Sequence, residues 1–190
     1  MTRSIVAITA GLSQPSSSRL LADRLLANVP VKADTSTFEL RDVAHDITDH
    51  LLTGFPSPKL KEVLEATAAA DGLVVVTPIF NASYSGLFKS FFDLFGDDEL
   101  QDKPVLIGAT GGTARHSLAL EHAVRPMFVH LHAVVAPTSV FVATDDWADK
   151  RLPARIERAG RELQALVEAR EPVVVKDPFA LTTSFEDLLA

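Results

Sequence analysis

The sequence LVVVTPIFNASYSGLFK, residues 73–89, is the most informative stretch of the chain. Its first four residues are all apolar, and such runs are typical of parallel strands buried on both faces. A loop rich in hydroxyl and amide side chains follows directly, from Thr77 to Ser85. Ligands of open α/β sheets bind at the carboxyl ends of the strands. The stretch therefore predicts a central parallel strand that ends in a ligand-binding loop.

Two other apolar runs lead into polar loops in the same way. The run at 5–8 is followed by GLSQPSSSR at 11–19, and the run at 105–107 is followed by TGGT at 110–113. Because the carboxyl ends of parallel strands meet at one edge of a sheet, the three loops are expected to converge. Their convergence predicts a cofactor site at that edge.

The composition limits the class of protein. A chain of 190 residues, 47% of them hydrophobic, fits one globular domain with a sizeable core. The net charge of -7 argues against nucleic acid as a partner, because phosphate backbones require a basic surface. The absence of cysteine excludes disulfides, thiolate catalysis and thiolate-bound metals. No apolar run approaches the about 20 residues that cross a bilayer, so we expect a soluble cytoplasmic protein without a membrane partner.

Apolar runs alternate with helical patterns along the chain. Strands are predicted at 4–10, 35–40, 72–77, 103–109 and 134–142, and helices at 16–27, 59–70, 86–95, 114–132 and 152–169. Residues 42–58, with Gly54, Pro56 and Pro58, are predicted as a loop with one helical turn. This alternation predicts a flavodoxin-like three-layer α/β sandwich with a five-stranded parallel sheet in the order 2-1-3-4-5.

One domain, 1–170, is expected to hold this sheet. Residues 171–190 are expected to form a tail that docks on the domain or on a partner subunit, with a short helix at 185–189.

The first loop has the donors that a phosphate needs. Ser13, Ser16, Ser17 and Ser18 bring hydroxyls to the start of a helix, and Arg19 adds a cation. An ordinary serine N-cap is the alternative, but the number of hydroxyls favours phosphate. Neither G-x-G-x-x-G nor the Gly-Lys-Ser/Thr of a Walker A loop is present here, which disfavours a Rossmann dinucleotide site and an ATPase.

The other two loops suit a flat heterocycle. Asn81, Ser83 and the backbone of 79–81 can bond the polar edge of an isoalloxazine ring, while Pro78 stiffens the exit of the strand. The glycines at 111–112 allow backbone to approach a ring closely. Plain turns, with Phe80 in the core, are the alternative for each loop alone. Together with the first loop, these details predict a flavin site.

Other sequence features bear on the function. Asp145-Asp146-Trp147 follows the last predicted strand and could border a ligand, although helix N-capping is the favoured role. His130 and His132 are two residues apart and would point to different faces of a helix, so no metal site is expected. A Gly-x-Ser-x-Gly elbow is absent from the sequence, which argues against a serine hydrolase.

The three loops, in this order, resemble the NAD(P)H-dependent FMN reductases of the flavodoxin-like superfamily over about residues 4–169. Residues 77–89 are similar to the family's T-P-x-Y-N-x-S-x-x-G-x-L-K signature, with Phe80 in place of tyrosine. Residues 109–126 look like the branch that serves two-component flavin monooxygenases, such as alkanesulfonate monooxygenases. That branch has a π-bulge at a subunit interface, and the resemblance places His122 in it.

The resemblance implies that FMN binds with its phosphate in the first loop and its ring between the second and third loops. NADH or NADPH would stack on the open ring face and pass hydride to the flavin, and reduced flavin could then feed a monooxygenase. The implied cofactor-binding residues are Ser13, Ser16, Ser17, Ser18, Arg19, Pro78, Ile79, Phe80, Asn81, Ser83, Thr110, Gly111, Gly112 and Thr113. No side chain is implied as an essential acid or base, and Arg115 and His116 are candidates for contacts with the nicotinamide nucleotide.

A homodimer or homotetramer is also implied. The alternatives are an FMN-containing quinone or azo reductase, a non-enzymatic electron carrier like flavodoxin, and a flavin-free interaction module. The T-x-T-G-x-T phosphate loop of short-chain flavodoxins is absent from the sequence, which argues against the electron carrier. The residues do not choose between NADH and NADPH.

Overall fold

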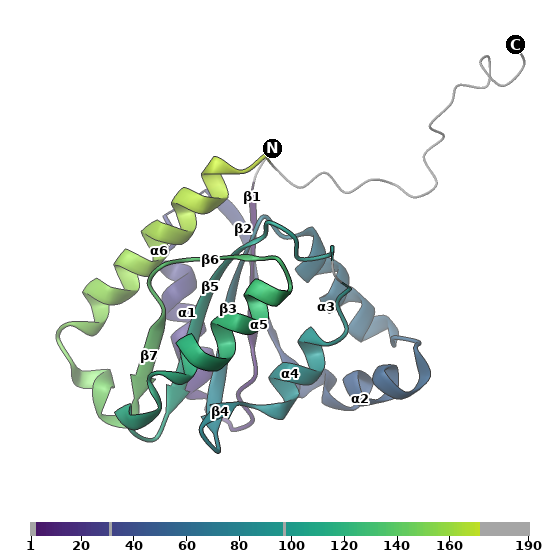
Figure 1. Cartoon of the computed structure of the whole chain (residues 1–190), viewed down its shortest axis with the longest axis horizontal. Coiled ribbons are helices and arrows are strands. Elements are labelled where there is room, and N and C mark those ends of the chain that lie inside the picture. Colours follow the sequence, from purple (N-terminus) through teal and green to yellow (C-terminus); the bar gives the residue numbers. More distant parts are fainter. Residues whose placement is uncertain (1–2, 31, 97, 172–190) are drawn as a thin grey trace, which may run out of the picture.

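The computed structural model describes residues 3–30, 32–96 and 98–171, and the expected tail therefore lies almost entirely outside the described residues (Figure 1). One twisted sheet runs through the middle of the molecule in the order β2-β1-β3-β5-β6, with β7 also paired to β5. All of these strands are parallel, and β4 adds to β3 as an antiparallel hairpin. The strands are β1 (Arg3–Thr9), β2 (Ala33–Glu39), β3 (Gly72–Phe80), β4 (Ser83–Tyr84), β5 (Pro104–Gly111), β6 (Val134–Val135) and β7 (Val140–Ala143).

Helices cover both faces of the sheet (Figure 1). Helices α1 (Ser17–Ala27) and α6 (Leu152–Ala169) pack on one face, and one core cluster there contains Leu25, Val74 and Leu163. Helices α2 (Ala44–Thr53), α3 (Pro58–Ala69), α4 (Gly86–Phe92) and α5 (Arg125–His130) cover the other face. Successive residues of β3 alternate between the two clusters, as the period of a strand requires. The flavodoxin-like three-layer sandwich is thus confirmed.

The fifth strand position is occupied by two short pieces rather than by one strand over 134–142. Ala136 still donates to the carbonyl of Val105, but the pairing stops there. Pro137 has no N–H, and the N–H of Thr138 donates to Glu162 Oε2 of α6 at 2.6 Å. A side chain from a distant helix therefore replaces the neighbouring strand as the hydrogen-bond partner between β6 and β7.

The expectation of a loop over 42–58 is wrong. A 3₁₀ turn, η1 (Leu40–Val43), leads into α2, which ends where Gly54 adopts the left-handed conformation with φ 79°. Leu40, Val43 and Ile47 are buried at a spacing that places them on one helix face. The breaking residues at 54–58 lie after this helix, so they end it rather than prevent it.

The expected helix over 114–132 is broken into a 3₁₀ turn, η2 (Ala114–His116), a π-helix, η3 (Leu120–Val124), and α5. His122 lies in the middle of the π-helix, which confirms the π segment that the resemblance implied. The N–H of Arg125 donates to the carbonyl of Leu120, five residues earlier. Pro126 has no N–H to donate, and the backbone hydrogen bonds change here from the five-residue spacing of the π-helix to the four-residue spacing of α5.

No helix in the described part of the chain combines the length and the hydrophobicity that a bilayer span requires. Its longest helix, α6, carries charged side chains along its exposed face.

The ammonium group of Lys103 is buried just before β5. Its Nζ donates to the carbonyls of Ala68 and Ala70, at 2.8 and 2.6 Å, and so caps the C-terminal end of α3. Burial lowers the pKa of Lys103 from 10.5 to about 8. The charged form is thus less favourable in the folded chain than in the unfolded chain.

This shift predicts a stability that rises with pH. Between the folded pKa near 8 and the unfolded pKa of 10.5, the unfolded chain binds more protons. The free energy of unfolding should therefore increase by about 2 kcal/mol from pH 7.5 to pH 10, relative to Lys103→Met, which lacks this titration. Urea denaturation at both pH values measures the difference, and Lys61→Met at an exposed site is the control. Equal pH dependence in the wild type and Lys103→Met would contradict the assignment.

The β3–β4 hairpin predicts a stabilising substitution. Asn81 and Ala82 form its two-residue turn with φ of 48° and 66°, a conformation that asparagine and glycine tolerate and alanine does not favour. Ala82→Gly should raise the free energy of unfolding by about 0.5–1 kcal/mol, because the left-handed strain exceeds the entropic cost of glycine. Ala82→Val should lower it. Thermal unfolding of both variants tests the sign, and an unchanged or reduced stability of Ala82→Gly would count against this reason.

Candidate functional site

A cavity of about 360 Å³ lies at the carboxyl ends of β1, β3 and β5, within the size range of small-molecule sites. The three predicted loops therefore do converge at one sheet edge. The cavity is lined by Gly11, Leu12, Ser13, Ser16, Ser17, Ser18, Pro78, Ile79, Phe80, Thr110, Gly111, Gly112 and Thr144. Four residues predicted for the site do not line it, namely Arg19, Asn81, Ser83 and Thr113.

The serines of the first loop have different tasks. Ser16 is the N-cap of α1, where its Oγ accepts a hydrogen bond from the N–H of Arg19 at 3.2 Å. Ser18 is buried, and its hydroxyl bonds to Thr110 Oγ1 at 2.8 Å, which ties the first loop to the third. Ser17 is exposed, with a long 3.5 Å contact to Thr110. Ser17 and the free N–H groups at the start of α1 are thus the donors left for a ligand.

The first loop folds back closely on itself. A Cβ on Gly11 would lie 2.0 Å from Ser16 Oγ, so a larger residue would have to displace this N-cap hydroxyl. Arg41 holds the loop from outside the cavity, because its Nη1 donates to the carbonyl of Ser13 at 2.6 Å while Nη2 pairs with Glu39 at 2.9 Å. Arg41 was not predicted, and nothing local in the sequence shows that it reaches this loop.

Arg19 does not supply a cation to the cavity. Its Nε pairs with Asp23 at 2.8 Å and its Nη1 pairs with Glu39 at 3.1 Å. Glu39, at the end of β2, therefore bridges Arg19 and Arg41 behind the loop. The expected cation in the loop is therefore wrong, because β2 brings a carboxylate to Arg19 that no local pattern in the sequence indicates.

The signature residues Thr77 and Ser85 position the second loop. The N–H of Ser85 donates to Thr77 Oγ1 at 3.1 Å, and Ser85 Oγ caps α4 by accepting from the N–H of Phe88. Phe80 is 47% exposed at the cavity, so the alternative that placed it in the core is wrong. Asn81 lies at the tip of the hairpin and Ser83 in β4, away from the cavity lining.

The third loop is packed against the end of the sheet. A Cβ on Gly111 would come within 2.9 Å of the ring of Phe141, whereas a Cβ on Gly112 would meet nothing within 4 Å. Close packing therefore requires glycine at position 111 but not at position 112. Thr113 is the N-cap residue of η2 and lies outside the cavity lining.

Thr144 is a lining residue that sequence reasoning missed. It begins η4 (Thr144–Ala148), directly after β7. Because β7 is parallel to β5, the residues that follow it reach the same edge of the sheet, and this position could have indicated Thr144 as a lining residue. Asp146 next to it accepts a hydrogen bond from the N–H of Ala143 at 2.8 Å, in keeping with the favoured capping role. The guanidinium of Arg24 lies over the ring of Trp147, with 5.0 Å between Arg24 Cζ and the ring centre.

Among the residues that the structure describes, every side chain that lines the cavity is uncharged. Hydroxyls and the start of α1 provide donors at one side, and apolar side chains with glycine backbone provide flat surfaces at the other. This donor set fits a ligand with one phosphate and a planar ring. It offers no acid or base to a reacting atom.

Known proteins match the chain over most of its length. Residues 3–148 match the family model described as NADPH-dependent FMN reductase. An NADH-dependent FMN reductase of Pseudomonas putida, SfnE, is 36% identical over 172 residues, which cover 87% of this chain and 92% of the relative. An FMN reductase (NADPH) of Pseudomonas aeruginosa is 34% identical over 177 residues, which cover 90% of this chain and 95% of that protein.

A solved structure agrees with these relatives. The X-ray structure of an oxidoreductase from Corynebacterium diphtheriae is 42% identical and superposes with a TM-score of 0.86, covering 90% of this chain and 99% of that one. With a family model that matches residues 3–148 and relatives that align over nearly their whole length, the chain belongs to the NADPH-dependent FMN reductase family.

Proposed function

We propose that this chain binds FMN in the cavity at the ends of β1, β3 and β5 and reduces it with NADH or NADPH. The observation that carries the proposal is the convergence of a hydroxyl-rich helix start with two ring-sized apolar and glycine surfaces in one cavity. When bound, FMN accepts hydride from the nicotinamide, and the protein supplies binding and orientation.

The lining residues have separable roles in this proposal. Ser17 and the free N–H groups at the start of α1 hold the phosphate, while Ser18 and Thr110 fix the two loops to each other. The ring lies between the segment 78–80 and the glycines 111–112. Arg19, Asn81, Ser83 and Thr113 have no part in the proposal, because they do not line the cavity.

We also propose that reduced flavin leaves the protein and supplies a flavin-dependent monooxygenase. The absence of a cation from the cavity lining supports this step, since hydroxyls and a helix start hold a phosphate less strongly than an arginine fork does. The proposal includes a cytoplasmic location and a homodimer or homotetramer. Leu118 and Val129, which are 61% and 58% exposed on either side of the π-helix, support an assembly through that face.

Purified protein mixed with NADH or NADPH should oxidise the nucleotide only when FMN is added. Loss of the absorbance of reduced nicotinamide measures the reaction, and heat-denatured protein is the control. Oxidation no faster than in that control would reject the proposal. If FMN instead co-elutes with the protein in gel filtration and electrons pass to quinones or azo dyes faster than to free FMN, the alternative of a quinone or azo reductase is correct.

Gly11→Ala should weaken FMN binding by about tenfold, because the new methyl group collides with Ser16 and displaces the loop, at a typical overpacking cost of about 1–3 kcal/mol. Gly86→Ala is the matched control, since a Cβ there meets no atom within 4 Å and Gly86 does not line the cavity. Quenching of FMN fluorescence gives both dissociation constants. Equal affinities of the two variants would mean that the first loop does not hold the phosphate.

A further inference from the structure

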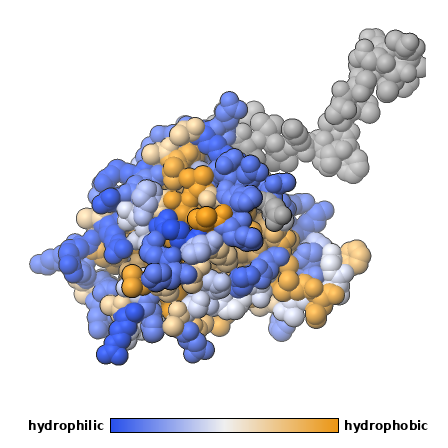
Figure 2. Space-filling view, viewed as in Figure 1, coloured by the Kyte–Doolittle hydropathy of each residue, from blue (hydrophilic) through white to orange (hydrophobic). Residues whose placement is uncertain are grey.

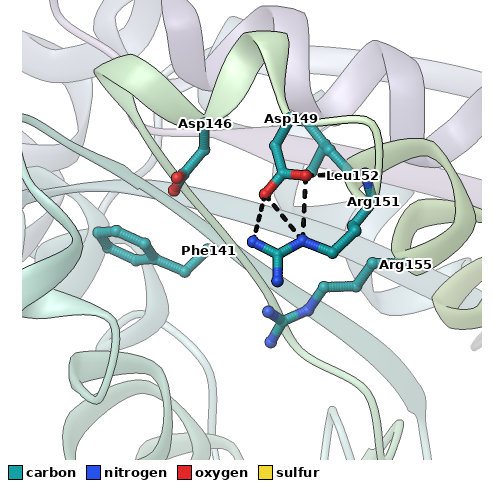
Figure 3. A pocket seen from close by; sticks show the side chains of 6 residues that line it. All are labelled: Phe141, Asp146, Asp149, Arg151, Leu152 and Arg155. Carbon is teal, nitrogen blue, oxygen red and sulfur yellow. Dashed lines mark hydrogen bonds and ion pairs between the residues drawn. The ribbon is translucent and has the colours of Figure 1, made fainter.

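A second cavity, of about 290 Å³, opens at the same edge of the sheet (Figure 3). It is lined by Phe141, Asp146, Asp149, Arg151, Leu152 and Arg155. Two features join it to the proposed flavin cavity. The ring of Phe141 lies against Gly111, and η4 contributes Thr144 to the first cavity and Asp146 to the second. The two cavities are therefore neighbours, separated by the contact of Gly111 with Phe141.

Arg155 offers an uncommitted cation to this second cavity. Its Nε donates to the carbonyl of Ser139 at 3.1 Å, and its terminal nitrogens have no hydrogen-bond or ion-pair partner among the residues that the structure describes. Figure 3 shows the guanidinium directed into the space between Arg151 and Phe141. The fixed Nε contact sets the orientation of the guanidinium and leaves its outer edge free for a ligand.

Two other charges of this cavity, Arg151 and Asp149, pair with each other, and Asp146 is held by a backbone N–H. Arg151 makes several contacts with the carboxylate of Asp149, and the hydrogen bonds from Arg151 lower the pKa of Asp149 to about 2. The carboxylate of Asp146 accepts from the N–H of Ala143. Arg155 is therefore the group best placed to attract an anion.

Space for a long ligand continues past Arg155. This residue also borders a cavity of about 560 Å³ that includes Thr138, Ser139 and Arg158, where the strand is interrupted between β6 and β7. A nicotinamide nucleotide that places its ring at the flavin must extend its adenosine half and its phosphates away from it. An arginine with a free planar fork is the side chain best suited to bind phosphate.

Resting on the proposed function, we propose that Arg155 and the cavity around it bind a phosphate of the adenosine half of NADH or NADPH. Either the diphosphate or the 2′-phosphate of NADPH has the required chemistry. The relatives do not decide between them, since one is named for NADH and the other for NADPH.

Titration calorimetry of FMN-loaded protein with 5′-ADP and with 2′,5′-ADP tests the site without turnover. Arg155→Ala should raise the dissociation constant of at least one probe by about tenfold, the value of one charge-assisted hydrogen bond. Arg161→Ala is the matched control, because it removes the same charge from an exposed ion pair on the same helix. It should leave both constants within about twofold. FMN affinity should be the same in both variants.

The two probes distinguish the phosphates. Both probes carry a phosphate on the 5′-oxygen, but only 5′-ADP carries the diphosphate. Weaker binding of both probes, or of 5′-ADP alone, to Arg155→Ala assigns the diphosphate, and weaker binding of 2′,5′-ADP alone assigns the 2′-phosphate. In steady state, Arg155→Ala should raise the KM for the matching nucleotide and leave kcat unchanged. If Arg155→Ala does not fold, Arg155→Gln removes the charge and keeps an amide donor for Ser139.

Three results would overturn the inference. They are failure of both probes to bind the wild type, equal binding of both probes to Arg155→Ala and to the wild type, and equal weakening of binding by Arg161→Ala. If the wild type oxidises NAD(P)H with FMN while any of these holds, only the inference about Arg155 fails. If the wild type does not oxidise NAD(P)H at all, the proposed function fails instead.

Discussion

The in-register parallel pairing of β1, β3 and β5 is the constraint on which the rest of the structure depends. Thr9 pairs with Val76, and Pro78 pairs with Thr110, so the three parallel strands end at one edge of the sheet, with β3 and β5 continuing past the end of β1. Both faces of these strands are buried, and a slip of one residue would exchange the side chains that face the two helix layers. The pairing therefore cannot shift at low cost. The pairing therefore places the loops that follow these strands at the same edge of the sheet.

Hydrogen bonds behind the cavity then fix each loop. The bond between Ser18 and Thr110, the bond from Ser85 to Thr77 and the bond from Arg41 to the carbonyl of Ser13 commit polar groups to the protein. What remains toward the cavity is a helix start, a few hydroxyls and backbone. This division explains why a loop with many serines can be both rigid and able to bind a ligand, since different serines do the two tasks.

Local patterns in the sequence were sufficient for the strands and for the convergence of the loops, because apolar runs and turn residues are local signals. They were not sufficient where a distant group decides the outcome. The split of the last strand depends on Glu162 of α6, and the position of the Arg19 side chain depends on Glu39 of β2. Helix α2 was missed because the breaking residues after it outweighed the spacing of its three buried side chains. The π-helix came from family resemblance alone, since no hydrophobic period marks it.

The distribution of charge connects the two proposals. The cations near the proposed flavin cavity, Arg19 and Arg41, both pair with Glu39, and each pairs with a second carboxylate, Asp23 or Asp42. A free cation inside the cavity would bind the phosphate of oxidised and reduced flavin equally, which adds affinity without favouring the transfer of hydride. It would also slow the departure of the product. A cation at Arg155 acts instead on the far end of the hydride donor, where it strengthens binding of the nucleotide and leaves release of the flavin unaffected. Separating the charge from the proposed flavin cavity thus agrees with the proposal that reduced flavin leaves the protein.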